Sequence, residues 1–136
     1  MKSYLLDTNI CAFCLRGQYD IDKKIDKVGL KNCYISVVTL FELKFGSELL
    51  LQKYGYDKRK EVDLFLENIK ILPFDNAIDF AVSEKARLQL SGTPADDNFD
   101  LLIAATAVVN GMVMVTDNTR HFEQISNIKL ENWVVR

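Results

Sequence analysis

Four acidic residues stand where a folded chain could bring their carboxylates together. Asp7 follows the apolar start of "YLLDTN", and Asp117 follows the apolar run "MVMVT" in the same manner. Glu42 and Asp100 lie in "SVVTLFELKFG" and "NFDLLIAATAVV", apolar segments whose spacing predicts helices. Four carboxylates at one place repel one another and raise one another's pKa, and none of these motifs has Lys or Arg in its core. A divalent cation is therefore the natural counter-charge.

The chemistry of such a cluster follows from its oxygen ligands. Mg²⁺ and Mn²⁺ prefer carboxylate oxygens and retain water in their coordination shell. A bound ion of this kind lowers the pKa of its water, orients it, and stabilises charge on a phosphoryl oxygen. The residues therefore predict metal-dependent phosphodiester hydrolysis, with Asp7, Glu42, Asp100 and Asp117 as both the catalytic and the metal-binding residues.

The two acids in helices also have structural explanations. Thr39 and Glu42 match the S/T-x-x-E pattern of a capping box, although Ser36 is the better helix start. Asp97 is a candidate N-cap, and Asp100 then lies in the first helical turn, where a negative charge favours the helix dipole. Either of these two acids suffices for that role, which leaves the other free.

The two acids that follow strands have a comparable alternative. The sequences "DTN" and "DNT" both favour turns, so Asp7 and Asp117 could simply form them. Each structural explanation accounts for one residue, whereas a shared site accounts for all four. We therefore favour the shared site.

The elements that would position these acids alternate between strands and helices. Strands are predicted over residues 2–6, 70–74, 112–116 and 128–135, and helices over 9–16, 20–29, 58–69, 75–91 and 98–110. The segment "CYISVV" predicts a further strand that turns into a long helix through about residue 53. This order predicts an α/β fold in three layers, a central, mainly parallel sheet flanked by helices, in which ligands bind at the carboxyl ends of the strands.

Composition limits the class of protein. The chain has 136 residues with 49% hydrophobic and 26% charged residues, without a composition shift or repeat, which predicts one globular domain over residues 1–136. No apolar run reaches the ~18 residues of a membrane span and no targeting segment is recognisable, so a cytoplasmic location is expected. The net charge of −2 means that any nucleic-acid binding must rest on a local basic rim or on bound metal.

Three cysteines do not suggest a disulfide framework, because their number is odd. Cys11 and Cys14 have C-x-x-C spacing, so a redox pair or a zinc site has to be weighed. Zinc would need further soft ligands, and Cys33 and His121 are far apart in sequence and lack a spacing signature. We expect the cysteines to act as small hydrophobic residues.

The segments "LLDTN", "SVVTLFELKFG", "FDLLIAATAVVNG" and "MVTDNTRHFEQI...LENW" resemble the PIN-domain ribonucleases, and within them the VapC-type toxins of toxin–antitoxin pairs. The resemblance runs from the first strand to Trp133. It implies that Asp7, Glu42 and Asp100 are the three principal acids and that Asp117 is the fourth, a position that some members fill with Asn. It also implies a set of supporting polar residues around the metal: Thr8, Asn9, Thr116 and Asn118.

Three residues of the matching region have less certain roles. His121 belongs to the "NTRHF" run and is expected to be structural, because a metal-bound water needs no histidine as its base. Asp96 and Asp97 make the loop "GTPADDNFD" more acidic than the family pattern. They either add an outer metal ligand or cap the following helix.

The resemblance implies an Mg²⁺- or Mn²⁺-dependent endoribonuclease, the toxin of a toxin–antitoxin pair, with tRNA or ribosomal RNA as candidate substrate. A cognate antitoxin would silence it by placing a basic segment in the acidic groove. Candidate RNA-contacting residues are Lys44, Lys53, Arg87 and Arg120, and single-stranded loops are the expected cleavage sites. The apolar segment "FGSELLLQKYGY" predicts a homodimer.

Two other classes of function remain. A magnesium-binding signalling module that accepts a phosphoryl group on an Asp would need paired acids after the first strand and a Lys after a late strand, whereas this chain has "DTN" and "TDN". A non-catalytic binding domain would be expected to have lost one of the principal acids, and all of them are present.

Overall fold

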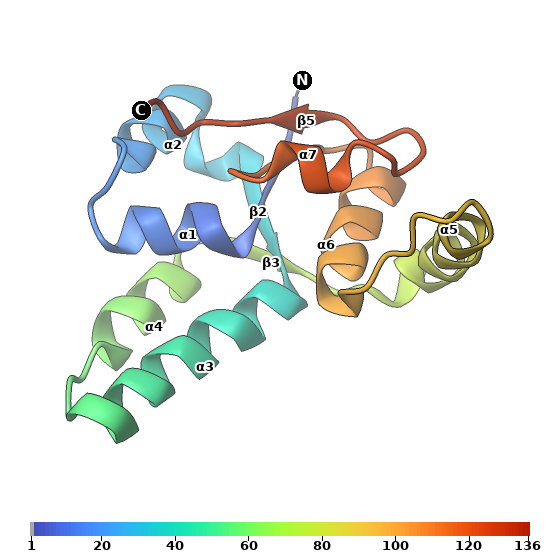
Figure 1. Cartoon of the computed structure of the whole chain (residues 1–136). Coiled ribbons are helices and arrows are strands. Elements are labelled where there is room, and N and C mark those ends of the chain that lie inside the picture. Colours follow the sequence, from blue (N-terminus) through green and yellow to red (C-terminus); the bar gives the residue numbers. More distant parts are fainter. Residues whose placement is uncertain (1) are drawn as a thin grey trace.

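A five-stranded parallel sheet forms the middle layer of the computed structural model, which describes residues 2–136. The strands are β1 (Tyr4–Leu6), β2 (Cys33–Ser36), β3 (Lys70–Leu72), β4 (Val113–Val115) and β5 (Leu130–Glu131). They lie in the order β3-β2-β1-β4-β5, and every neighbouring pair is parallel. The first strand of the sequence is therefore the central strand of the sheet (Figure 1).

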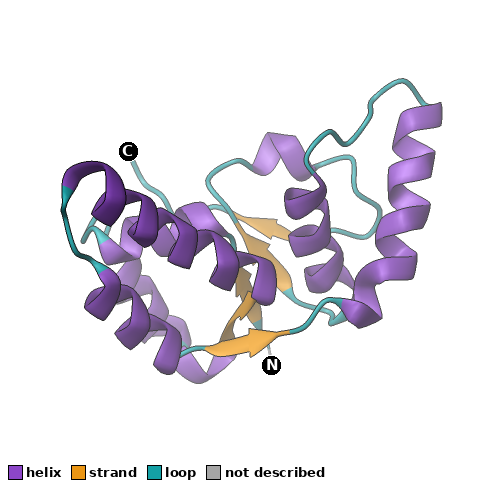
Figure 2. Ribbon diagram, turned by 90° about the horizontal axis from the view of Figure 1, so that it is seen from below, coloured by secondary structure: helices purple, strands orange, loops and turns teal. Residues whose placement is uncertain are grey.

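Helices cover both faces of this sheet (Figure 2). In the described residues they are α1 (Thr8–Leu15), α2 (Ile21–Val28), α3 (Val37–Tyr54), α4 (Arg59–Glu67), α5 (Ile78–Leu90), α6 (Asn98–Val109) and α7 (Thr119–Phe122), with short 3₁₀ turns η1 (Leu30–Asn32) and η2 (Asp75–Ala77). This arrangement confirms the predicted three-layer α/β fold.

Two apolar cores, one on each face of the sheet, hold the layers together. Successive side chains of a strand point to opposite faces. Accordingly, Leu6 packs in the core that includes Ile10 of α1, and Leu5 packs in the other core beside Ile103 of α6. All four are fully buried leucine or isoleucine side chains, and each contributes roughly 1.5–3 kcal/mol of hydrophobic stabilisation.

Local capping explains why two helices begin where the acidic residues need them. The side chain of Ser36, at the end of β2, accepts a hydrogen bond of 3.1 Å from Val38 N and starts α3. The side chain of Asp97 accepts from Phe99 N at 2.9 Å and from Asp100 N at 3.2 Å and starts α6. Ser36 is thus the N-cap of α3, and the capping-box explanation of Glu42 is wrong.

The C-terminal region differs from the sequence prediction. The strand predicted over 128–135 is limited to β5, because after Glu131 the side chain of Asn132 accepts a hydrogen bond from Val134 N and turns the chain. The ring of Trp133 lies 5.4 Å from that of Tyr4. The predicted turn "DNT" leads into α7, a helix too short to produce a recognisable period in the sequence.

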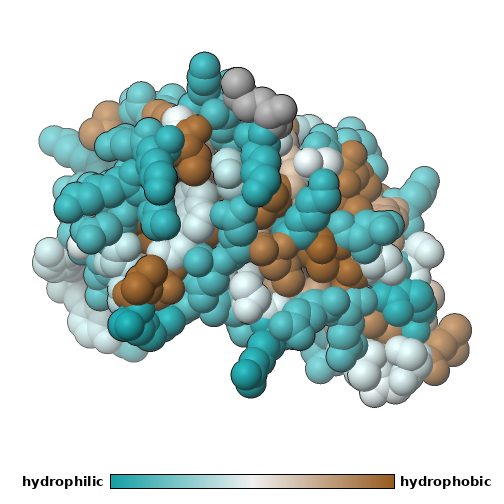
Figure 3. Space-filling model, turned by 90° about the horizontal axis from the view of Figure 1, so that it is seen from above, coloured by the Kyte–Doolittle hydropathy of each residue, from teal (hydrophilic) through white to brown (hydrophobic). Residues whose placement is uncertain are grey.

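Within residues 2–136, no helix combines the length and apolar character needed to cross a bilayer. On the face seen in Figure 3, hydrophobic residues form patches separated by hydrophilic ones.

Candidate active site

The parallel pairing of β1 with β4 brings Asp7 next to Thr116. Leu6 is in register with Val115, and Asp7 N donates to Val115 O at 2.9 Å. The Asp7 carboxylate accepts from Thr8 N at 2.8 Å and from the Thr116 hydroxyl at 2.9 Å, and the residue is only 5% exposed. Asp7 is the N-cap of α1, so it has the kind of local structural role that was the alternative to a shared site. The capping bond engages Oδ1, and Thr116 binds Oδ2.

Thr8 connects Asp7 to Glu42 on α3. The Thr8 hydroxyl donates to Glu42 Oε1 at 2.6 Å and lies 3.0 Å from the hydroxyl of buried Thr39. Because α3 starts directly after β2, Glu42 projects from its second turn over the carboxyl end of the sheet. The half-buried Glu42 carboxylate is therefore held beside the one at the end of β1.

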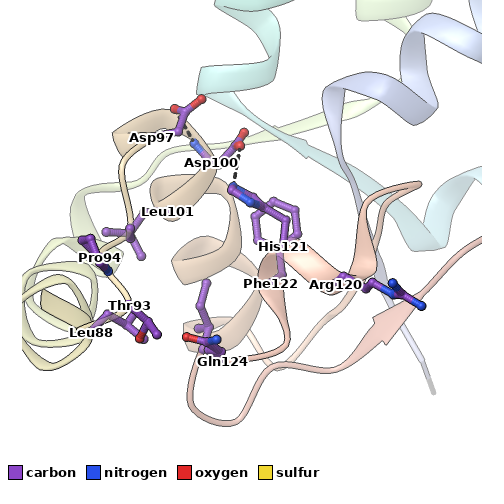
Figure 4. Close-up of a pocket in the computed structure, with 12 residues that line it drawn as sticks. Leu88, Thr93, Pro94, Asp97, Asp100, Leu101, Arg120, His121, Phe122 and Gln124 are labelled. Carbon is purple, nitrogen blue, oxygen red and sulfur yellow. Dashed lines mark hydrogen bonds and ion pairs between the residues drawn. The ribbon is translucent and has the colours of Figure 1, made fainter. Parts of the chain in front are cut away.

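Asp100 enters the same region from α6. Its Oδ2 lies 3.3 Å from Nε2 of His121 on α7, and Figure 4 shows the two side chains facing each other with Asp97 nearby. Because Asp97 supplies the side-chain cap of α6, the Asp100 carboxylate is not needed for capping. The question about Asp97 is thereby answered in favour of a cap, whereas Asp96 is an exposed residue of the preceding loop.

The carboxylates of Asp7, Glu42 and Asp100, here called the acidic cluster, influence one another's charge. Burial is the main cause that raises the pKa of Asp100 to about 6, and the negative charges of Asp97, Asp7 and Glu42 add to it. Burial also raises the pKa of Asp7, and Glu42 adds to that shift. His121 opposes both shifts. The structure therefore brings three of the four predicted acids together.

The fourth acid, Asp117, has a different environment. Its carboxylate forms two bonds with the guanidinium of Arg136, at 2.8 and 2.7 Å, and accepts from Asn132 at 3.2 Å. The Arg136 hydrogen bonds are the main cause that lowers the pKa of Asp117. The absence of Lys and Arg from the motif cores therefore does not leave Asp117 without a basic neighbour. Arg136 lies 19 residues further along and belongs to no motif, so sequence reasoning had no signal for it.

The supporting residues form a network between β1 and β4. Asn9 Nδ2 donates to the Thr116 hydroxyl at 3.4 Å, and Asp117 N donates to Asn9 Oδ1 at 3.3 Å. Asn118 contributes its backbone N–H, which donates to the Thr116 hydroxyl at 3.1 Å. Thr8 and Thr116 therefore orient Glu42 and Asp7 through their side chains, and Asn9 holds the Thr116 hydroxyl and the backbone of Asp117.

The acidic cluster fits a divalent cation in its chemistry. Its donors are carboxylate oxygens, the hard ligands that Mg²⁺ and Mn²⁺ prefer, and burial makes the charged state of Asp7 and Asp100 costly without a counter-charge. As the side chains stand, no group of three or more His, Cys, Asp or Glu within residues 2–136 is close enough to enclose an ion. The carboxylates would have to draw together to bind one.

The three cysteines are not part of the candidate active site. Cys11 and Cys33 are buried, Cys14 is half-buried, and all three are free thiols. Burial raises the pKa of each thiol, to about 11 for Cys33, which keeps them protonated. Cys11 packs in the core beside Leu6, in agreement with the hydrophobic role predicted for it.

A pocket opens beside Asp100. It has a volume of about 240 Å³ and lies between the loop before α6 and α7, with Leu88, Leu101 and Phe122 among its apolar walls. Figure 4 shows Asp100 and His121 at one end of it and Gln124 at the other, whereas the Arg120 side chain extends away. Space for part of a substrate is thus available next to the acidic cluster.

Comparison with known proteins places the chain in a family. Residues 4–128 match the PIN domain. The chain is 31% identical to the tRNA(fMet)-specific endonuclease VapC of Salmonella typhimurium, over 98% of this chain and 99% of that protein. It is 32% identical to ribonuclease VapC2 of Rickettsia felis, over 96% of this chain and 97% of that protein.

The fold agrees with these sequence relationships. The crystal structure of DNA-bound VapBC from Salmonella typhimurium contains a chain that matches with a TM-score of 0.84 and 30% identity, over 98% of this chain and 99% of that chain. The match to the PIN domain covers the acidic cluster and all five supporting or fourth-acid positions between Thr8 and Asn118. The chain belongs to the PIN-domain family, among its VapC-type members.

Proposed function

We propose that this protein is an Mg²⁺- or Mn²⁺-dependent endoribonuclease and the toxin of a toxin–antitoxin pair. The observation that carries the proposal is the convergence of Asp7, Glu42 and Asp100 at the carboxyl end of the sheet. Asp7 and Glu42 accept hydrogen bonds from neutral donors, and Asp100 faces His121. A full-length relative at 31% identity is named as a tRNA-specific endonuclease, which supports RNA as the substrate.

The residues of the site have separate tasks. The two hydrogen bonds to Asp7 fix both of its oxygens before any ligand arrives, and the Thr8 hydroxyl fixes Glu42. Asp100 completes the donor set from α6 and is steadied by His121. A divalent cation held by these carboxylates would activate water and stabilise the charge on the phosphodiester. The hydrogen bonds that already hold Asp7 and Glu42 reduce the entropy that is lost when the carboxylates draw together around the ion.

We propose a tRNA as substrate, cut in a single-stranded loop, where splayed bases leave the backbone accessible. Of the basic residues predicted to contact RNA, Arg87 is instead bound to Glu84, and Lys44 lies 3.5 Å from Asp63. Arg120 lines the pocket beside Asp100, with its side chain directed outward. Arg120 is therefore the candidate that is best placed to contact a phosphate of bound RNA.

The test is an RNA cleavage assay with purified protein. Labelled initiator tRNA, an elongator tRNA and a ribosomal RNA fragment are incubated with Mg²⁺, with Mn²⁺ and with a chelator. We expect metal-dependent cleavage within a loop, and sequencing of the ends identifies the site. Activity that is unchanged in chelator would contradict the proposed metal dependence. Transfer of phosphate from a small phosphodonor to the protein would instead support the signalling alternative.

A groove between α1, α3 and α4 is our proposed docking site for the antitoxin. It has a volume of about 470 Å³ and runs from Thr8 and Glu42 at the acidic cluster to Tyr54 at the end of α3, with Leu43 and Leu50 in its wall. Its apolar wall suits an apolar segment, and its acidic end suits an Arg or Lys of that segment. Such a cation would supply the counter-charge that a metal otherwise provides.

A second apolar surface on α3 is our proposed homodimer contact. Phe41, Phe45 and Phe99 are 58%, 57% and 43% exposed. Phe41 stacks on Phe45 with ring centres 6.4 Å apart and meets Phe99 edge-on at 5.8 Å. The segment 45–56, which predicted the dimer, is thus divided: Phe45 lies in this phenylalanine surface, whereas Leu50 lines the groove.

Two substitutions test these surfaces against each other. Leu50→Glu should weaken binding of the co-expressed antitoxin by at least about tenfold and leave the dimer intact, because it places a charge in an apolar wall. Phe45→Glu should convert the dimer to monomer and leave antitoxin binding within about twofold of the parent. Calorimetry and light scattering measure the two effects. Unchanged affinity in Leu50→Glu would contradict the groove as docking site.

A further inference from the structure

The salt bridge between Arg136 and Asp117 joins the C-terminal segment to the carboxyl end of β4. The guanidinium contacts both carboxylate oxygens, at 2.8 and 2.7 Å, in the bidentate geometry that makes Arg–carboxylate pairs strong. The Asp117 side chain is 17% exposed and that of Arg136 is 59% exposed. The acid is thus largely sheltered, and the cation covers it from the solvent side.

Further contacts hold this pair in place. The guanidinium carbon of Arg136 lies 5.3 Å from the centre of the Tyr19 ring, within the range of a cation–π contact. Tyr19 and the following Asp20 both have positive φ, 59° and 53°, a backbone conformation that is unfavourable for residues other than glycine. Asn132 donates to the same carboxylate at 3.2 Å. The turn at Tyr19 and the segment after β5 therefore both contact the pair of Arg136 and Asp117.

Asp117 is nevertheless next to the acidic cluster. The preceding residue, Thr116, donates its hydroxyl to Asp7 at 2.9 Å, and Asp117 N donates to Asn9 in α1. The Asp117 carboxylate is thus one residue away from a partner of Asp7, and Arg136 is the cation that neutralises it.

We propose that Arg136 is a positioning residue that withholds Asp117 from the metal site, so that Asp117 becomes a fourth ligand only when Arg136 is displaced. This inference rests on the proposed metal dependence. It predicts that loss of the bidentate pair strengthens binding of a divalent cation, because a sheltered carboxylate is freed beside three others. An approaching RNA phosphate is a group that could draw Arg136 away, since Arg binds phosphate in the same bidentate manner.

The test measures Mn²⁺ binding by calorimetry, without RNA. Arg136→Gln is expected to lower the dissociation constant roughly tenfold or to add a second bound ion. Arg136→Lys keeps the positive charge and loses the fork geometry, so it is expected to give a smaller shift in the same direction. Both shifts should vanish in the Asp117→Asn background. The matched control is Arg59→Gln, which breaks a bidentate pair with Asp57 at 3.0 and 2.9 Å on the exposed start of α4.

The outcomes separate this inference from the proposed function. Mn²⁺ binding that is lost in Asp7→Asn but identical in the parent and Arg136→Lys would overturn the role of Arg136 alone. A shift in Arg136→Lys that persists without the Asp117 carboxylate would overturn it as well. Absence of Mn²⁺ binding in the parent would overturn the metal site and this inference together. High salt should narrow the difference between the parent and Arg136→Gln, because the pair is partly exposed.

Discussion

Asp7 and Glu84 are both acidic residues with 5% exposure, yet their surroundings are opposite. The Glu84 carboxylate accepts two hydrogen bonds from Arg87, both at 2.9 Å, and two from Ser126, at 2.6 and 3.1 Å. The Arg87 bonds are the main cause that lowers the pKa of Glu84 to about 2. The Asp7 carboxylate has only neutral donors, and burial raises its pKa.

This difference distinguishes a structural acid from a functional one. Glu84 on α5 is paired within the protein and ties that helix to the loop that contains Ser126. The negative charge of the acidic cluster lowers the stability of the fold, and a bound cation from outside would offset this loss. Burial alone does not separate Glu84 from Asp7. The internal cation beside Glu84 does, and it predicts opposite effects of mutation for these two acids.

The largest expected effect is the loss of activity when the acidic cluster is neutralised. Asp7→Asn, Glu42→Gln and Asp100→Asn should each reduce RNA cleavage by at least about 100-fold, because each removes a carboxylate that we propose binds the metal, a contact worth several kcal/mol in the transition state. The fold should be retained or become more stable, since like-charge repulsion is relieved. Cleavage rates and melting temperatures measure the two effects.

Two further variants calibrate this result. Asp96→Asn changes an exposed acid in the loop before α6 and should leave cleavage near that of the parent. Asp117→Asn should lose less activity than Asp7→Asn, because Arg136 already neutralises its carboxylate. Near-native turnover in all three cluster variants would mean that the site has been assigned wrongly.

The second effect concerns Glu84. Glu84→Gln should lower the free energy of unfolding by about 1–3 kcal/mol, because it removes the charge that Arg87 and Ser126 bind. Urea denaturation measures this change, and cleavage per folded molecule should stay the same. Glu123→Gln, at an exposed position, is the control. A Glu84→Gln protein as stable as the parent would contradict the structural role.

The third effect is a pH dependence of opposite sign in the two regions. The folded pKa of Asp100, about 6, lies above its ordinary 3.8, so the folded state holds the proton more tightly than the unfolded state. Ionisation of Asp100 therefore lowers the free energy of unfolding progressively as the pH rises from 3.8 to about 6. The folded pKa of Glu84, about 2, lies below its ordinary 4.5, so its contribution is present above 4.5 and is lost as the pH falls toward 2.

Measuring the stability of single variants at two pH values tests these opposite pH dependences. At about pH 7, Asp100→Asn should be more stable than the parent by roughly 1 kcal/mol, a value reduced for partial exposure, and this gain should disappear at about pH 4. The loss in Glu84→Gln should persist in large part at about pH 4. Thermal unfolding in metal-free buffer is the measurement. A gain in Asp100→Asn that is independent of pH would contradict the assigned cause.

Predicting these effects from sequence succeeds where local pattern decides the structure. The apolar runs before Asp7 and Asp117 identified the strands that end at the site, and the start of α3 at Ser36 was recognisable from its capping residue. The extent of β5 was overestimated. Alternation in "IKLENWVV" predicts extended backbone, whereas strand length depends on how far the neighbouring β4 extends.

The structure confirms the predicted proximity of the acids whose positions follow from topology. Asp7, Glu42 and Asp100 come together because a strand end and two helices meet at one edge of a parallel sheet. The pairing of Glu84 with Arg87 spans only three residues and was overlooked, whereas the contacts of Glu84 with Ser126 and of Arg136 with Asp117 span 42 and 19 residues. Without a motif, a pairing of that kind is visible only in the folded structure.

The smallest expected effect belongs to the cysteines, which lie outside both regions. Cys11→Ala and Cys14→Ala should lower the free energy of unfolding by about 0.5–1.5 kcal/mol through lost packing, with the larger loss at buried Cys11. Cleavage should be equal in reducing and oxidising buffer. Activity that follows the redox state of the buffer would bring back the C-x-x-C interpretation.

Among the strands of this sheet, β1 is the first to be synthesised, yet it lies in the middle of the sheet. Thr116, whose hydroxyl fixes Asp7, is 109 residues further along the chain. At about 5–20 residues per second, translation separates these two residues by roughly 5–20 seconds. During that interval the nascent chain carries Asp7 without β4 beside it. The site can therefore assemble only after β4 and Thr116 have been synthesised, late in the synthesis of this domain.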